Sequence, residues 1–271
     1  MNKFYIQIAL FLLSIFVYAN NETFAAETSP GEDTKPQLRS RYATPEEVYE
    51  KNKHLLCHCH NHTPAIKLMN EAVKQLEYYA TSKDGYEVYA QNPNDSISYY
   101  VKKIDGQTNI LKINLNIYGS NQYNDIINRL WDPTIPNIFD KSSGGILHMY
   151  NPNLVVTYQI LKKDSKNYYK YFYALSGKAE ISKDKTIIAM TSINVNDSNS
   201  SNREYKNPIL KNAESFVSPL KHASNLVDKA YNEIYVNLAG YLIEKKGDDL
   251  EITYIESVSD IQFLITYFNN L

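Results

Sequence analysis

The sequence has little cysteine, little glycine, a single tryptophan and no excess of either charge. Two cysteines in 271 residues are too few for a disulfide framework, so the hydrophobic core must stabilise the fold. The formal net charge is −2, with acidic and basic residues interspersed, whereas a nucleic-acid-binding protein would carry a strongly basic segment. We therefore expect no nucleic-acid partner, and one good-sized core or at most two small domains.

Long hydrophobic runs are also scarce, and only residues 8–17 stand out. This run follows Lys3 and precedes compact residues at positions 17–19, which is the layout of a secretory signal peptide. No other stretch approaches the roughly 20 apolar residues of a membrane span. We predict a cleaved signal peptide at residues 1–26, a flexible linker at residues 27–43, and one ordered domain at residues 44–271 of a secreted protein.

Two helices are predicted at the start of this domain. Thr44, Pro45 and Glu47 have the spacing of a capping box, and a second helix is expected to begin at Thr63 and Pro64. The apolar residues of the second helix recur at three- and four-residue spacing, which predicts one buried face. They are Ile66, Met69, Val73, Leu76 and Tyr79 with Ala80.

From residue 85 the apolar period changes to two, and strand-like runs alternate with turn residues. Three runs (85–91, 97–104 and 108–119) precede a short helix at residues 120–133. About six further strands follow, with a polar insertion at about residues 196–233. This order predicts an α+β fold with one long antiparallel sheet, which must curl. A short C-terminal helix behind Asp260 would enclose a space against such a sheet.

The stretch HLLCHCHNH, residues 54–62, holds both cysteines and four of the six histidines. Zinc sites usually take ligands in spaced pairs, whereas Cys57, His58, Cys59 and His60 are consecutive and point in different directions. His54 and His58 would share a helix face only if the first helix continued to Cys59. We predict an exposed linker with free thiols and no functional metal site.

Motifs for catalysis are missing from the sequence. There is no Gly-x-Ser-x-Gly elbow, no Gly-rich phosphate loop and no His-Glu-x-x-His pattern. His148 and His222 are the only histidines outside the cluster. We expect no enzyme activity and no cofactor.

The order of elements resembles the START domain, a helix-grip fold in which a long curved sheet wraps a C-terminal helix around a lipid tunnel. AGYLIEKKGDDLEITYIES, residues 239–257, resembles the paired terminal strands of that family. The signal peptide, TPEEVYEKNKHLLC, LWDPTIPN, YNPNLV, KYFYAL and YKNPI resemble a narrower group, the fam-a START-like proteins of malaria parasites. The resemblance runs from Met1 to about Ser257.

This resemblance implies a START-like fold with N-terminal and short C-terminal helices enclosing a lipid cavity. It implies a secreted or exported carrier that binds phospholipid, with phosphatidylcholine the expected cargo, and transfers it between membranes. The location expected from the family is the parasitophorous vacuole or the host cell. The chain departs from the family at HCHNH and in its short C-terminus, since a helix over residues 260–271 would span only about 18 Å. The short C-terminus favours an alternative, a degenerate START-like module that acts as a protein-interaction or surface module.

A carrier of phosphatidylcholine needs an aromatic environment for the choline group and an apolar lid. A cation over an aromatic ring gains roughly 1 to 2 kcal/mol when desolvated, although core packing alone also explains buried aromatic residues. The candidates for the lipid site are Trp131, Tyr158, Tyr171, Tyr173, Tyr241 and Tyr254. The candidates for the lid, which would also make transient membrane contact, are Ile261, Leu264, Ile265 and Phe268. Lysine pairs at strand ends (102/103, 162/163 and 245/246) could touch anionic head groups, and we expect a monomer.

Overall fold

The computed structural model describes residues 42–56, 62–91, 96–105, 108–137, 142–162, 169–195, 205–216 and 232–259. All of these residues belong to one unit, Ser40–Ile261. The predicted signal peptide, nearly all of the predicted linker and the predicted lid residues (Ile261, Leu264, Ile265 and Phe268) lie outside the described residues. None of the helices described here is long and apolar enough to cross a membrane.

Helix α2, Pro45–Lys51, begins with the predicted capping box. The Thr44 hydroxyl accepts a hydrogen bond from the Glu47 backbone N–H at 3.2 Å, and the Thr44 N–H donates to the Glu47 carboxylate at 2.9 Å. The helix ends at Lys51, and a 3-10 turn, η1 (Lys53–Leu55), follows. The first helix therefore stops well before Cys59, so the helical spacing that would have paired His54 with His58 is not formed.

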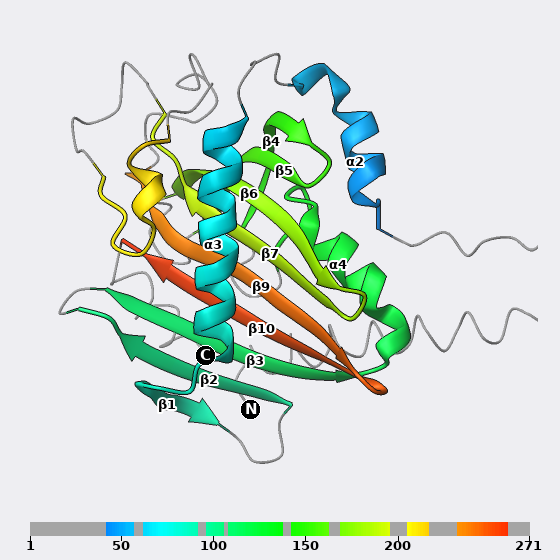
Figure 1. The fold of residues 1–271 in the computed structure, drawn as a ribbon, viewed down its shortest axis with the longest axis vertical. Helices are drawn as coiled ribbons and strands as arrows, with labels where there is room; N and C mark the ends of the chain where they lie inside the picture. Colours follow the sequence, from blue (N-terminus) through cyan, green and yellow to red (C-terminus); the bar gives the residue numbers. More distant parts are fainter. Residues whose placement is uncertain are drawn as a thin grey trace, which may run out of the picture. The chain divides into compact units, whose positions relative to one another are not determined.

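One antiparallel sheet forms the centre of the domain, as predicted, with the order β1-β2-β3-β10-β9-β7-β6-β5-β4 (Figure 1). Its strands are β1 Tyr86–Gln91, β2 Ile97–Lys103, β3 Asn109–Tyr118, β4 Ser143–Asn151, β5 Leu154–Lys162, β6 Tyr169–Ser182, β7 Lys185–Ser192, β9 Val236–Lys246 and β10 Asp249–Val258. A two-residue strand, β8 (Asn232–Glu233), pairs in parallel with β6. The pairing of β3 with β10 joins the first three strands to the end of the described chain.

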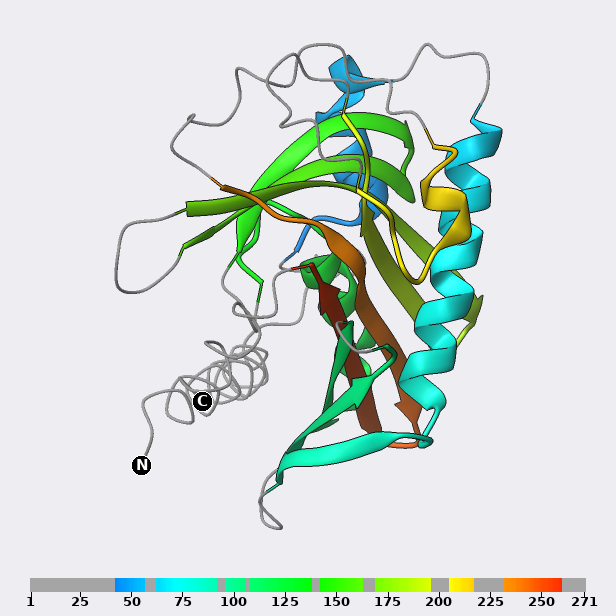
Figure 2. The same cartoon turned by 90° about the vertical axis from the view of Figure 1, so that its left-hand side faces the viewer.

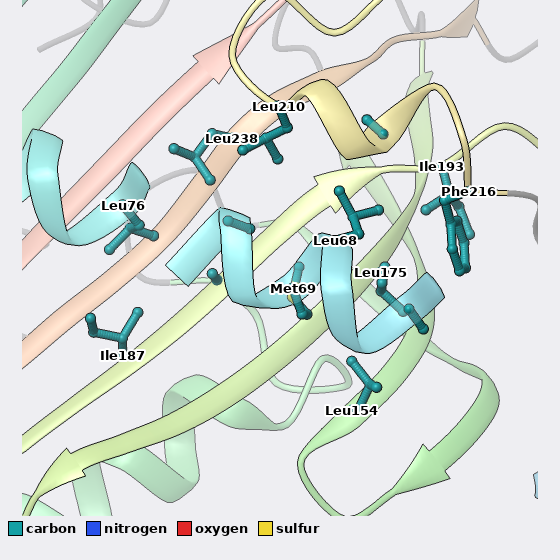
Figure 3. Packing of buried hydrophobic residues seen from close by; sticks show 14 of the residues in the cluster. Leu68, Met69, Leu76, Leu154, Leu175, Ile187, Ile193, Leu210, Phe216 and Leu238 are labelled. Atoms are coloured by element: carbon teal, nitrogen blue, oxygen red, sulfur yellow. The ribbon is translucent and has the colours of Figure 1, made fainter. Parts of the chain in front are cut away.

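Helix α3, Thr63–Thr81, lies across β7, β9, β6 and β10 on one side of the sheet, which we call the outer face (Figure 1). Its buried side meets strand residues such as Leu175, Ile187 and Leu238 (Figure 3). The buried residues of α3 are Ala65, Leu68, Met69, Ala72, Leu76, Tyr79 and Ala80. The prediction was therefore wrong for Ile66, which is 44% exposed, because the buried side of α3 is centred on Ala65, Leu68, Ala72 and Leu76 and Ile66 lies beside it.

Two glycines allow α3 to approach the outer face closely. A Cβ atom at Gly177 would lie 2.6 Å from Cγ of Met69. A Cβ atom at Gly240, whose φ is +143°, would lie 2.8 Å from Leu76 Cδ1 and 2.0 Å from the backbone oxygen of Ile188. Only glycine adopts the positive φ of Gly240 without strain, and at both positions only glycine lacks the Cβ atom that would collide with these neighbours. These two positions thus set how near the helix can lie to the sheet.

A segment within the predicted polar insertion, residues 205–216, is fastened to the outer face beside α3. The buried Asn207 amide donates to Thr191 Oγ1 at 3.0 Å and to the Asn237 carbonyl at 2.8 Å, and it accepts from the N–H groups of Ile209 and Leu210. These bonds satisfy the polar groups of a buried turn. The 3-10 turn η3, Lys211–Ala213, follows.

The beginning of η3 is held by α3 itself. The Glu71 carboxylate accepts from Lys211 N at 3.0 Å, from Asn212 N at 2.9 Å and from Asn212 Nδ2 at 2.7 Å. Leu210 and Phe216 then pack into the core cluster with α3 (Figure 3). The insertion therefore contains a buried, structured part that its polar composition did not indicate.

Helix α4, Tyr123–Trp131, lies on the opposite side of the sheet, which we call the inner face (Figure 2). Its first residue is tied to β7, because the Tyr123 hydroxyl and Thr186 Oγ1 form a hydrogen bond of 2.9 Å. The strands at both ends of the sheet bend away from α3, so the inner face is the concave one (Figure 2). The predicted curl of the sheet is confirmed, and it encloses the side that carries α4.

Candidate functional site

The register of the central strands defines which side chains share the inner face. Tyr254 of β10 pairs directly with Tyr241 of β9 and with Ile113 of β3, and Tyr241 pairs with Ile188 of β7. Directly paired residues point to the same side of an antiparallel sheet. The rings of Tyr241 and Tyr254 lie 5.0 Å apart at 40°. Together these residues form a row across the middle of the inner face.

The same register extends the row into a broad apolar surface on β2, β3, β10 and β9. All of its members are buried and large, which is typical of a surface that contacts other apolar groups. They are Ile97, Tyr99, Leu111, Ile113, Leu115, Ile117, Ile243, Leu250, Ile252 and Tyr254.

The inner face becomes more polar toward β7, β6 and β5. Thr157 and Gln159 of β5 pair with Ala174 and Phe172 of β6, and Thr157 Oγ1 lies 3.4 Å from Ser176 Oγ. The Ser142 hydroxyl donates to Gln159 Oε1 at 2.9 Å. All of these polar side chains are buried. One concave surface thus has an apolar part and a part with buried hydrogen-bonding groups.

Sequence reasoning missed these polar residues. Thr157 and Gln159 occur at the same parity as Val155 and Leu161 in the run LVVTYQILK, so they interrupt an otherwise apolar row. Residues two positions apart in a strand face the same side of the sheet. A polar residue two positions from buried apolar residues is therefore the signal that could have identified them. The buried Glu256 of β10, which pairs with Leu111, is a second example.

Trp131 ends α4 on the inner side and is 4% exposed. Its indole Nε1 is buried and has no hydrogen-bond partner among the described residues. A buried tryptophan N–H usually finds an acceptor, and an unpaired buried donor costs about 1 to 3 kcal/mol. The described part of the inner side therefore includes a donor with unused hydrogen-bonding capacity.

A small pocket follows the C-terminal end of α4, in the stretch LWDPTIPN. Its volume of about 30 Å³ accommodates one or two waters and is too small for an acyl chain. Tyr241 and Gln159 line it from the inner face, and Arg129 lines it from α4. The Arg129 guanidinium donates to the Tyr42 hydroxyl at 2.7 Å and lies 5.3 Å from the centre of the Tyr42 ring. The pocket thus joins α4, the inner face and the beginning of the domain.

The other three tyrosine candidates lie on the outer face. Tyr158 pairs directly with Tyr173, which belongs to the core cluster of α3, and the Tyr171 and Tyr173 rings meet edge to face at 5.6 Å. The Tyr158 ring covers Gly145, where a Cβ atom would lie 2.9 Å from the ring. The structure therefore brings Tyr241 and Tyr254 together and separates them from Tyr158, Tyr171 and Tyr173 by the thickness of the sheet, so one head group cannot contact both groups.

The histidine-rich stretch is attached to β4 at both of its ends. Leu56 forms a parallel bridge with Met149, and the His62 ring meets the Tyr150 ring edge to face at 5.2 Å. His148 packs against the same Tyr150 ring at 5.4 Å. Residues 57–61 and His222 lie outside the described residues. Among the residues that are described, no cluster of three His, Cys, Asp or Glu side chains could hold a metal ion.

Comparison with protein-family models gives no match for this sequence, and comparison with curated proteins gives none either. Among solved structures, human StAR-related lipid transfer protein 5 is similar with a TM-score of 0.55 and 9% sequence identity, over 77% of this chain and 91% of that one. Human STARD10 has a TM-score of 0.48 and 12% identity, over 72% of this chain and 70% of that one. The long antiparallel sheet, its flanking helices and the first of these similarities show that this chain has the START-like, helix-grip fold.

Proposed function

We propose that this protein is a START-like lipid carrier that binds a phospholipid and transfers it between membranes. The observation that carries the proposal is the concave inner face, which combines large apolar side chains with buried hydrogen-bonding groups. An amphiphile needs both, because each methylene removed from water gains about 0.8 kcal/mol while a buried polar group requires a partner. The START-like fold, shared with a human lipid transfer protein, supports it.

Phosphatidylcholine is the proposed cargo. Tyr241 and Tyr254 offer adjacent ring faces for the choline cation, and the unpaired Trp131 Nε1 can donate to a lipid oxygen. The proposal assigns no covalent chemistry, no cofactor and no nucleic-acid partner to the protein. It includes the lid at Ile261, Leu264, Ile265 and Phe268, which would cover the acyl chains and touch the membrane.

The proposal extends to secretion through the signal peptide and to membership of the fam-a START-like group. The motifs LWDPTIPN and YKNPI support that assignment, and the structure gives both a structural context. LWDPTIPN lines the pocket beside Tyr241, and YKNPI holds Asn207 in its buried turn. The location proposed on this basis is the parasitophorous vacuole or the host cell.

Native mass spectrometry of the predicted mature chain, residues 27–271, tests the proposal after incubation with vesicles of mixed lipids and re-purification. One phosphatidylcholine per chain is the expected result, and deletion of residues 260–271 should abolish the complex. A truncated protein that still carries lipid would contradict the assigned lid. A folded but empty mature chain would support the degenerate START-like surface module instead.

A further inference from the structure

The outward side of α3 differs from its buried side in charge as well as exposure. Ile66, Asn70, Lys74 and Tyr78 follow one another at four-residue spacing, and Lys67 lies beside them. All five are exposed, and the two apolar members are unusually so, with 44% for Ile66 and 52% for Tyr78. One helix ridge thus presents two lysines between two large exposed side chains.

The acidic residues of α3 make their direct contacts with groups other than these lysines. Glu71 accepts three hydrogen bonds from η3, and Glu77 forms an ion pair with Lys185 at 2.8 Å. Neither Lys67 nor Lys74 has an ion pair with a carboxylate among the described residues. Both lysines are exposed and without a direct ion pair in this part of the chain, although Glu71, one turn from each, keeps its negative charge because its hydrogen-bond donors are neutral.

The positive surface continues past the C-terminal end of α3 onto β1 and β2. Lys102 Nζ lies 5.7 Å from the Tyr78 ring and donates to the backbone oxygen of Asp84 at 2.8 Å. Lys83 is exposed beside it, and Val88 of β1 is 60% exposed. The carboxylate of Asp84 opposes these lysines with one negative charge.

The buried Lys112 senses this concentration of charge. Its pKa is lowered to about 8, first by burial and then by the positive charges of Lys102 and Lys83. Its ammonium group lies 4.0 Å from the Tyr86 ring and donates to the Ser82 carbonyl at 2.7 Å. Burial, followed by repulsion from Lys102 and Lys83, thus disfavours the charged form of Lys112.

We propose that this surface docks on membranes rich in anionic phospholipids. Lysines near an anionic bilayer are attracted to it, and exposed aromatic and aliphatic side chains insert at the level of the head groups. Such a partner matches both properties of the surface at once. The α3 basic surface, as we define it, consists of Ile66, Lys67, Lys74, Tyr78, Lys83, Val88 and Lys102.

The α3 basic surface lies on the outer face, on the other side of the sheet from the proposed lipid site. Docking there would leave the inner face free to exchange its ligand. The inference is independent of the proposed function, because it holds whether or not the inner face binds a lipid.

Vesicle flotation with the mature chain tests the inference, with phosphatidylcholine vesicles that contain or lack 30% phosphatidylserine. Binding only to the anionic vesicles in 0.1 M salt, and its loss in 0.5 M salt, is expected. The triple variant K67Q/K74Q/K83Q should lower the affinity about 100-fold, which is about fivefold for each lysine. The control variant K51Q/K53Q/K183Q removes three exposed lysines elsewhere on the described surface and should retain binding.

Equal losses in the two triple variants would overturn the assignment of this surface. If the wild-type protein does not bind anionic vesicles, or binds both vesicle types equally, the docking proposal itself is overturned. Native mass spectrometry of the same samples keeps the two proposals apart. Bound lipid should be unchanged in K67Q/K74Q/K83Q, whereas failure of the carrier proposal would appear as empty protein that still floats with anionic vesicles.

Discussion

The two faces of the sheet differ in the helix that each receives and in how close that helix lies. On β9, the neighbours Gly240 and Tyr241 point to the outer and the inner face, respectively. The outer face receives a 19-residue helix that comes close to the sheet at Gly177 and Gly240, whereas the inner face, among the described helices, receives the 9-residue α4. The outer face is therefore suited to one fixed partner from the same chain, and the inner face to a larger and exchangeable contact.

The largest expected effect comes from a substitution that disrupts the close packing around Gly240 on the outer face. Gly240→Ala should lower the free energy of unfolding by about 4 kcal/mol or more, because the new Cβ would lie 2.0 Å from the Ile188 oxygen and would stress a positive φ. Gly247→Ala is the matched control on β9's turn, since it also has a positive φ of +65° but nothing within 4 Å. It should cost about 1 to 2 kcal/mol. Urea denaturation of both variants measures the loss of stability in each. Equal losses would show that backbone strain, and not the contact with Ile188, accounts for the effect of Gly240→Ala.

The next largest effect concerns the hydrogen bonds that hold residues 205–216 on the outer face. Asn207→Ala should cost about 2 to 4 kcal/mol, because it leaves the N–H groups of Ile209 and Leu210 without their acceptor and removes one hydrogen bond of the buried Thr191 hydroxyl. Limited proteolysis should also cut this segment faster. Asn70→Ala, at an exposed position of α3, serves as the control and should change stability by less than about 0.5 kcal/mol. An unchanged cleavage rate in Asn207→Ala would contradict the role given to Asn207.

The charge buried at the end of α3 predicts a pH dependence. The pKa of Lys112 is about 8 in the folded protein, and a lysine in the unfolded chain has a pKa of about 10.4. Between these values the unfolded chain binds more protons, so the stability rises with pH from 8 to 10 and lacks this contribution below pH 8. The gain should be about 1 to 3 kcal/mol.

Urea unfolding of the wild type from pH 7 to 9.5 measures this gain. The range stops at pH 9.5 because burial raises the pKa of Tyr86, which would lower the stability at higher pH. Lys112→Met keeps the apolar stem and should remove the slope. A slope that persists in Lys112→Met would assign the effect to another group.

The smallest expected effect distinguishes the tyrosines of the inner face from those of the outer face. Tyr254→Leu on the inner face and Tyr173→Leu on the outer face both replace a buried ring, so each should lower the stability by about 1 to 3 kcal/mol. Only Tyr254→Leu should also lower phosphatidylcholine binding, by about 5- to 30-fold, because it removes a ring face from the proposed choline site. Lipid transfer between labelled vesicles measures this difference, and an equal loss in Tyr173→Leu would contradict the placement of the site on the inner face.

Much of the fold was predictable because its signals are local. The capping box at Thr44 and Glu47, the period of two in the strands and the turn residues between them all act within a few residues of the chain. The resemblance to START domains placed these elements in one curved sheet, and the observed sheet confirms it. The face of α3 was predicted less well, because hydropathy favours Ile66 over Ala65, whereas Ala65 is buried and Ile66 is 44% exposed.

The candidate site was predicted only in part, because β9 is buried on both sides. Residues 236–243 of this strand are all buried, so its sequence shows no alternation that would tell one face from the other. The Asn207 turn was missed for a related reason, since an asparagine in a polar stretch gives no sign that four hydrogen bonds will bury it.

The sequence by itself determined the helices, the strands, their order and the turns between them, because capping, periodicity and turn chemistry depend on near neighbours. Only the tertiary structure decided that Tyr241 and Tyr254 share the inner face while Tyr158, Tyr171 and Tyr173 lie with α3. The physical reason is the register: a strand displays its residues alternately, and the pairing of strands far apart in the chain decides which side becomes concave and which side receives the helix.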